Sequence, residues 1–211
     1  MGIIKAFNGD HYVKEEFEKL IKRFKIKTAV ETGTYLGETT EVLAKIVKKV
    51  YTIESVKENY KKAKERLKNY KKVTALLGNS PKAMDYLLLK AEKPILFFLD
   101  AHWGRYWPIL DELKVIAKHK CKNSVIVIHD FYVPNSGLYY DSYLNEKNSL
   151  IYWPKTAINY LFWKLTGKDF IKKQKLDYEY IKPALMRINP GYKHYYNSKS
   201  DSNIGVVYIH P

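Results

Sequence analysis

Polar and ionisable side chains stand at the end of each of the five buried strands that the sequence predicts. They are Glu31, Glu54, Asn79, Asp100 and the pair His129 and Asp130. The carboxyl ends of parallel strands meet at one edge of an α/β sheet, and ligands bind there at the point where the strand order reverses. Surface solvation would explain one or two such residues. Five in succession indicate a binding or catalytic site at that edge.

A glycine turn follows the first of these strands, in the stretch Thr-Ala-Val-Glu-Thr-Gly-Thr-Tyr-Leu-Gly-Glu-Thr-Thr at 28–40. Gly33 and Gly37 permit backbone angles that other residues avoid, and they let a ligand approach the main chain closely. The helix that begins after the turn presents free N–H groups. Glu31 is unusual because a carboxylate at the end of a buried strand needs a partner. The stretch is either an ordinary strand–turn–helix with a capped acid or the site of a cationic ligand.

Glu54 ends the second strand about 20 residues after Gly33, where an acid accepts hydrogen bonds from a ribose diol. Two classes of cofactor use this arrangement, dinucleotides and S-adenosylmethionine. A dinucleotide turn has the form G-x-G-x-x-G around a pyrophosphate, whereas this chain has E-x-G-x-x-x-G. Glu31 would repel a pyrophosphate but suits an ammonium or sulfonium group. The pattern therefore favours S-adenosylmethionine.

Four segments resemble motifs of class I methyltransferases. They are Val-Glu-Thr-Gly-Thr-Tyr-Leu-Gly at 30–37 for motif I, Tyr-Thr-Ile-Glu at 51–54 for the second motif, Gly-Asn-Ser at 78–80 for the adenine-side loop, and Leu-Asp-Ala-His-Trp at 99–103 for motif IV. The resemblance covers residues 25–130 well and 190–211 in outline. Within that class, the chain looks most like small-molecule O-methyltransferases of the macrocin and catechol types, which use a divalent metal.

The resemblance implies a set of cofactor-binding residues by position. They are Glu31, Gly33, Thr34, Tyr35, Gly37, Thr39, Thr40, Glu54, Ser55, Asn79, Ser80 and Asp100. It also implies S-adenosylmethionine as the cofactor and methyl transfer to an acceptor that the protein positions.

A divalent cation is the second cofactor that the resemblance implies, with Asp100, His129 and Asp130 as its ligands. The two aspartates suit Mg²⁺. His129 stands where an acid is usual, and imidazole favours Mn²⁺, Fe²⁺ or Zn²⁺ over Mg²⁺. The alternative is a site without metal, in which His102 or His129 removes the proton of the acceptor beside Asp100. Either histidine could instead orient its neighbours through hydrogen bonds.

Helical spacing of apolar residues alternates with the predicted strands, which argues for a doubly wound α/β fold. Helices are predicted at 13–25, 38–48, 56–70, from Pro81 onward, and at 107–118, 156–165 and 178–187, with terminal strands at 193–197 and 204–210. The resemblance implies a mostly parallel seven-stranded sheet in the order 3-2-1-4-5-7-6, with helices on both faces and an antiparallel terminal pair. We expect a single domain over 1–211, with a lid or cap insertion at about 131–190.

Composition narrows the class of protein and its partners. The 211 residues include 37 basic and 22 acidic ones, which gives a net charge of +15, and one cysteine, Cys121. We expect a cytoplasmic protein without a membrane segment, because no signal sequence, long apolar run or disulfide framework is present.

The acceptor is the least determined partner. A small-molecule hydroxyl, such as that of a sugar or glycan precursor, is favoured. Nucleic acid is the alternative that the positive charge suggests, although the lysines are spread along helices. A non-catalytic protein that binds S-adenosylmethionine is the third possibility. The apolar segment 150–165 makes a homodimer plausible.

Overall fold

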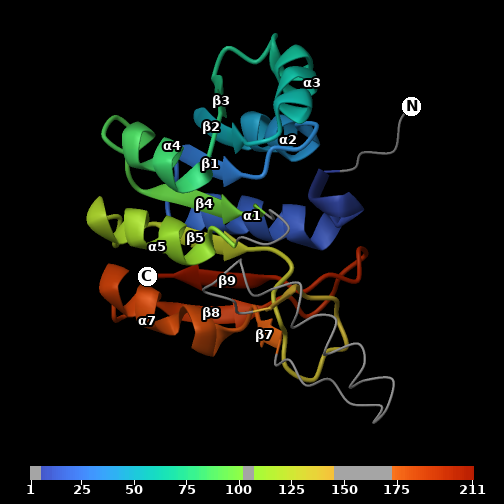
Figure 1. Ribbon diagram of the computed structural model, residues 1–211, viewed down its shortest axis with the longest axis vertical. Coiled ribbons are helices and arrows are strands. Elements are labelled where there is room, and N and C mark those ends of the chain that lie inside the picture. The colour runs from blue at the N-terminus through green and yellow to red at the C-terminus, as the bar shows by residue number, and fades with distance from the viewer. Residues whose placement is uncertain (1–5, 102–106, 145–172) are drawn as a thin grey trace, which may run out of the picture.

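The main sheet has seven strands in the order β3-β2-β1-β4-β5-β9-β8. The computed structural model describes residues 6–101, 107–144 and 173–211. The strands are β1 (Thr28–Thr32), β2 (Lys49–Glu54), β3 (Val73–Leu77), β4 (Ile95–Leu99), β5 (Val125–Ile128), β8 (Lys193–Tyr196) and β9 (Val207–His210). The first five are parallel, and β9 runs antiparallel to both of its neighbours (Figure 1). The predicted order 3-2-1-4-5-7-6 is confirmed.

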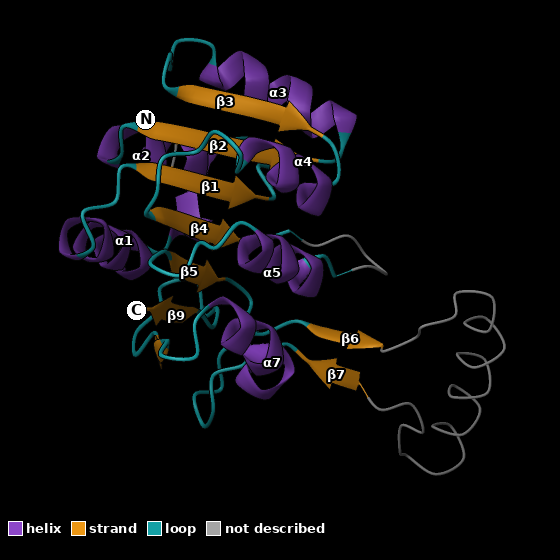
Figure 2. Ribbon diagram, turned by 90° about the vertical axis from the view of Figure 1, so that its left-hand side faces the viewer, coloured by secondary structure: helices purple, strands orange, loops and turns teal. Residues whose placement is uncertain are grey.

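Helices cover both faces of this sheet (Figure 2). Two of them, α1 (His11–Arg23) and α2 (Glu38–Ile46), pack on one face together with the short helix η1 (Ala6–Gly9). The helix α3 (Lys57–Leu67) lies beside α2, where its Arg66 forms ion pairs with two glutamates of α2. The opposite face carries α4 (Ser80–Leu87), α5 (Ile109–Lys118) and α7 (Tyr178–Ile188). The doubly wound arrangement is therefore confirmed.

The central strand β4 explains why the sheet forms where it does. Ile95, Phe97 and Leu99 point into the core beneath α4, α5 and α7, while Leu96 and Phe98 point into the core beneath α1 and α2. All five side chains are buried. A strand covered on both faces reads as a continuous apolar run, which is how this segment appears in the sequence.

Capping residues set the starts of several helices. Asp10, Asn79 and Asp177 each accept a hydrogen bond from the backbone N–H three residues later, at the starts of α1, α4 and α7. The cap at Asp10 places the start of α1 at His11, two residues before the predicted 13. The last strand is shorter than the predicted 204–210, because Ile204 forms only an isolated bridge with Tyr139 before β9 begins.

The predicted insertion 131–190 is described in part. The strands β6 (Ser142–Leu144) and β7 (Lys173–Lys175) pair antiparallel and form a two-stranded sheet of their own (Figure 2). Within the same range, α7 contributes Ile181 and Leu185 to the core of the main sheet. The predicted helix at 156–165 lies outside the described residues. Among the residues that the structure describes, no helix combines the length and apolar character that a membrane crossing requires.

Candidate functional site

A cavity of about 310 Å³ opens at the carboxyl ends of β1, β2, β4 and β5. Its size falls in the range of about 300–1,000 Å³ that cofactor sites occupy. It lies where β1 separates the two halves of the sheet, as expected for ligands of doubly wound folds. The lining residues are Asn8, Gly33, Tyr35, Ile53, Glu54, Ser55, Val56, Asn59, Asp100, Ala101 and Asp130. Five of the predicted cofactor residues are among them: Gly33, Tyr35, Glu54, Ser55 and Asp100.

Gly33 lets the chain segments after β1 and β4 touch at the edge of this cavity. Its φ is +84°, and a Cβ atom there would collide with the carbonyl oxygen of Asp100 and crowd Ala101. The N–H of Asp100 donates to the carbonyl of Thr32 at 3.2 Å, so the two strand ends are also tied together. Only glycine satisfies both the backbone angle and the close approach.

Glu54 is held by three backbone donors. Its Oε2 accepts a hydrogen bond from the N–H of Tyr35 at 2.7 Å, and its Oε1 accepts from Ser55 at 2.9 Å and Val56 at 2.8 Å. The carboxylate is therefore fixed in one orientation on the cavity wall. An ionised carboxylate oxygen accepts about two hydrogen bonds, so Oε2 keeps one site for a ligand hydroxyl.

Glu31 lies outside the set of cavity-lining residues and is only 1% exposed. Its Oε2 accepts hydrogen bonds from the hydroxyls of Thr52, at 2.6 Å, and Thr40. The Thr52 hydroxyl in turn bonds to that of Thr34. Burial raises the pKa of Glu31 to about 7. Within the described part of the chain, Oε1 has no hydrogen-bond partner. Thr34 and Thr40, predicted to contact the cofactor, instead stabilise this carboxylate.

Four further residues of the predicted cofactor set lie away from the cavity wall. Gly37 has φ +86° and precedes α2, where a Cβ atom would press on Leu67. Thr39 accepts a hydrogen bond from the backbone of η1, Asn79 caps α4, and Ser80 donates to the buried Glu112. Each therefore has a structural partner, and the polar groups after β3 do not reach the described cavity.

Asp100, His129 and Asp130 form a cluster at the ends of β4 and β5. The Nδ1 atom of His129 lies 3.3 Å from Oδ1 of Asp100 and 3.2 Å from Oδ2 of Asp130. One ligand atom from each residue lies within 4.8 Å of the other two. Burial opposes the charged imidazolium, but the two carboxylates outweigh it and raise the pKa of His129 to about 10. At neutral pH the protonated imidazole of His129 therefore offsets one of the two negative charges of Asp100 and Asp130.

The two aspartates face the cavity, whereas His129 lies behind them. The side chain of His129 is 1% exposed, and its Nε2 has no hydrogen-bond partner within the described residues. Because His129 is buried and is not among the residues that line the cavity, a molecule in the cavity does not reach its imidazole directly. His102, the other predicted base, lies outside the described residues.

Asn8 and Asn59 are polar cavity residues that the sequence reasoning missed. Asn59 lies in the first turn of α3, five residues after Glu54 at the end of β2. Asn8 comes from η1, far from the glycine turn in the sequence, and has a positive φ of 55°. The only available signal was the Asn8–Gly9 pair, which is typical of left-handed turns. That signal predicts a turn but not where the turn points.

A scan against protein-family models found no match, and a search of the curated proteins found no relative. Several solved structures share the fold. A putative caffeoyl-CoA O-methyltransferase from Staphylococcus aureus is 13% identical, with a TM-score of 0.56 over 96% of this chain and 84% of that one. The O-methyltransferase TomG from Streptomyces achromogenes, in complex with S-adenosylmethionine, is 14% identical, with a TM-score of 0.55 over 94% and 79%.

An rRNA methylase from Streptococcus thermophilus is 12% identical, with a TM-score of 0.52 over 95% of this chain and 94% of that one. Likeness at this level of identity establishes the fold. The chain therefore has the fold of class I S-adenosylmethionine-dependent methyltransferases, the fold that its sequence motifs predict. The proteins found with this fold include one named a putative caffeoyl-CoA O-methyltransferase and one named an rRNA methylase. The fold therefore does not determine which kind of molecule accepts the methyl group.

Proposed function

We propose that this protein is an S-adenosylmethionine-dependent methyltransferase that acts on a hydroxyl group of a small molecule. The observation that carries the proposal is the charge of the cavity. All ionisable side chains among its lining residues, apart from the phenol of Tyr35, are acids: Glu54, Asp100 and Asp130. S-adenosylmethionine carries a sulfonium, an ammonium and one carboxylate, and is therefore a net cation. An acidic cavity attracts such a cofactor and repels the pyrophosphate of a dinucleotide.

Each wall residue has a role in this proposal. The free acceptor site on Oε2 of Glu54 takes a hydroxyl of the ribose. Asp100 lies on the wall beside Gly33 and accepts the proton of the acceptor hydroxyl as its oxygen attacks the methyl group in line with the sulfur. His129, protonated between two carboxylates, orients Asp100 and Asp130 and does not itself receive the proton.

A divalent cation fits the residues of the acidic cluster. Two carboxylate oxygens and one imidazole nitrogen converge within 4.8 Å, which is a suitable set for Mn²⁺ and less so for Mg²⁺. Asp100, His129 and Asp130 would hold the ion, and a cation there would lower the pKa of an acceptor hydroxyl. Binding requires His129 to lose the proton that the two carboxylates stabilise, so uptake of the ion releases protons.

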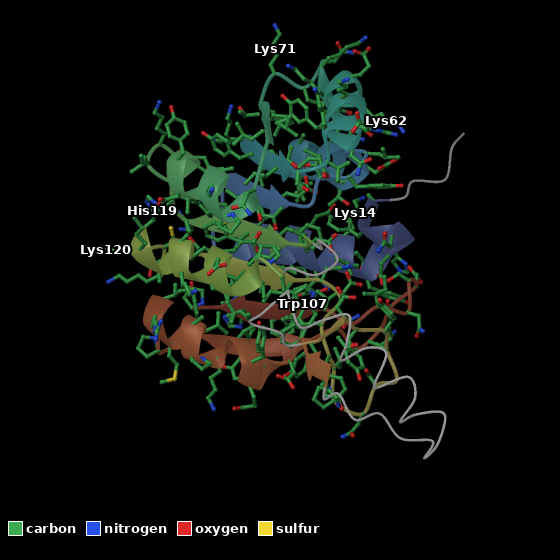
Figure 3. The ribbon with its side chains drawn as sticks, viewed as in Figure 1. Lys14, Lys62, Lys71, Trp107, His119 and Lys120 are labelled. Atoms are coloured by element: carbon green, nitrogen blue, oxygen red, sulfur yellow. The ribbon has the colours of Figure 1, made fainter. Side chains whose placement is uncertain are left out.

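The distribution of positive charge supports a small acceptor over nucleic acid. Lys62 and Lys71 project from the end of the molecule that carries α3 (Figure 3). Lys120 projects from the turn after α5, and Lys14 lies on α1, so cations are found on several parts of the surface. Several other cations pair with acids, such as Lys118 with Asp85. A nucleic-acid surface would gather its cations in one stripe. We propose a sugar or glycan-precursor hydroxyl as the acceptor.

The acids that follow β4 and β5, Asp100 and Asp130, favour an enzyme over a non-catalytic binding protein. A cytoplasmic location is also proposed, since the single cysteine, Cys121, is a buried free thiol. A homodimer stays a prediction, because the segment 150–165 lies outside the described residues.

Calorimetry with S-adenosylhomocysteine tests the cofactor. We expect wild-type protein to bind it and Glu54→Gln to bind at least about tenfold more weakly, because a hydrogen bond to a charged group contributes about 1.5–3 kcal/mol. Glu58→Gln, at an exposed site on α3, is the matched control and should bind as wild type does. Binding of NAD without binding of S-adenosylhomocysteine would contradict the proposal. A titration of Mn²⁺ in a weakly buffered solution should release protons, and Asp100→Asn should abolish this release.

A further inference from the structure

The short helix η1 holds an uncommon backbone conformation next to the cavity. Phe7 and Asn8 have φ values of 52° and 55°, in the left-handed region. A bulky residue such as Phe7 adopts this conformation only where surrounding contacts enforce it. Such conformations cluster at functional sites, and η1 presents Asn8 to the cavity.

The contacts of Phe7 enforce this conformation. Its ring is buried, with its centroid 4.8 Å from that of Phe17 and 5.8 Å from that of Phe98. Its N–H donates to the hydroxyl of Thr39 on α2 at 3.0 Å, and its carbonyl accepts from the N–H of Asp10 at 3.0 Å. Because Phe7 is fixed in the core, the backbone of the next residue, Asn8, is fixed as well, and Asn8 lines the cavity.

Eight of the eleven lining residues fall into two groups by their origin, and the other three, Gly33, Tyr35 and Ala101, come from the segments that follow β1 and β4. Ile53, Glu54, Ser55, Val56 and Asn59 come from the end of β2 and the start of α3, and in the proposed function they surround the ribose. Asn8 comes from η1, Asp100 follows β4 and Asp130 follows β5, and in the proposed function these three lie along the rest of the cofactor. Within the described lining, Asn8 is the only residue of the second group with a side-chain amide.

The methionine end of the cofactor carries an ammonium and a carboxylate. The negative charges of Asp100 and Asp130 attract the ammonium, but they repel the carboxylate. A carboxylate left without a donor in a partly closed cavity is costly. We infer that the side-chain amide of Asn8 donates a hydrogen bond to the α-carboxylate of S-adenosylmethionine. The rigid turn of η1 then serves to hold this donor in place. This inference rests on the proposed function.

A pair of ligands that differ at the methionine end tests the inference. S-adenosylhomocysteine has the amino-acid portion, and 5′-methylthioadenosine lacks it. In calorimetry, Asn8→Asp should weaken binding of S-adenosylhomocysteine by about tenfold or more, because a charge-assisted hydrogen bond becomes a repulsion. Binding of methylthioadenosine should change by less than about twofold. Aspartate tolerates the left-handed conformation as asparagine does, so η1 should keep its structure.

Two further variants separate the outcomes. Asn8→Gly removes the amide without adding charge or strain, and should weaken only S-adenosylhomocysteine, by a smaller factor than Asn8→Asp does. Asn59→Asp is the matched control at the ribose end, and should change the affinity of both ligands by the same factor. Equal loss of both ligands in the Asn8 variants, or no loss of either, would overturn the inference. If wild-type protein binds neither ligand, the proposed function itself fails.

Discussion

The buried Glu112 makes the stability of the protein depend on pH in a way that one substitution can test. Glu112 lies on α5 and accepts a hydrogen bond from the hydroxyl of Ser80. Burial raises its pKa to about 7 from an ordinary value of 4.5. Each pKa unit corresponds to about 1.4 kcal/mol. The free energy of unfolding therefore falls by about 3 kcal/mol as the pH rises from 4.5 to 7, because the acid ionises in the unfolded chain but not in the folded one.

The sign follows from proton counts. Between pH 4.5 and 7 the folded chain keeps the proton of Glu112, whereas the unfolded chain has released it. The folded state binds more protons, so the free energy of unfolding falls as the pH rises through this window. Glutamine has no proton to lose, so Glu112→Gln removes this contribution. Burial raises the pKa of Glu31 to about 7 as well, so the single variant should keep about half of the decrease.

Urea denaturation followed by fluorescence measures this dependence at several pH values from 4.5 to 7 and at constant ionic strength. Glu58→Gln makes the same chemical change at an exposed site on α3, and its profile should run parallel to that of wild type. The contribution of His129 is common to all three proteins and cancels in their differences. Parallel profiles for wild type and Glu112→Gln, whatever their offset, would refute the reasoning.

Two other substitutions test the cavity. Gly33→Ala should lower the free energy of unfolding by about 2–4 kcal/mol, because a Cβ meets the Asp100 carbonyl and the residue must keep a φ of +84°. It should also weaken S-adenosylhomocysteine binding in calorimetry, and unchanged affinity would contradict the proposal that the cofactor occupies the cavity beside Gly33. The affinity for S-adenosylmethionine should rise with pH up to about 7, as the cation favours ionised Glu31. Glu31→Gln should flatten that profile, and a profile that persists in the variant would assign it to another group.

The sheet was predictable because its signals are local. The apolar run of β4 is continuous, since the strand is covered on both faces. The proximity of the acids was predictable as well, because parallel strands place their carboxyl ends at the same edge of the sheet. Glu54 and Asp100 accordingly line the cavity as the sequence suggested.

The roles of other residues depend on contacts between distant segments, which local patterns do not contain. Glu31 was expected to face the cofactor, yet its carboxylate turns to the hydroxyl of Thr52 on the neighbouring strand. Thr39 was expected to bind the cofactor from the start of α2, yet η1 supplies its partner. Asn8 lies on the cavity wall because the neighbouring Phe7 packs against Phe17 and Phe98 in the core. Each outcome was decided by packing between segments far apart in the chain.

The charge of the cavity has a consequence for turnover in the proposed reaction. S-adenosylmethionine enters as a net cation, and S-adenosylhomocysteine leaves as a neutral zwitterion, because the methyl group departs with the positive charge of the sulfur. The acidic wall formed by Glu54, Asp100 and Asp130 attracts the first more than the second. Asn8 would contact the carboxylate that both forms share, so it holds the cofactor without distinguishing them. Electrostatics would then favour exchange of product for fresh cofactor, most strongly where Glu31 is ionised and adds a further negative charge beneath the wall.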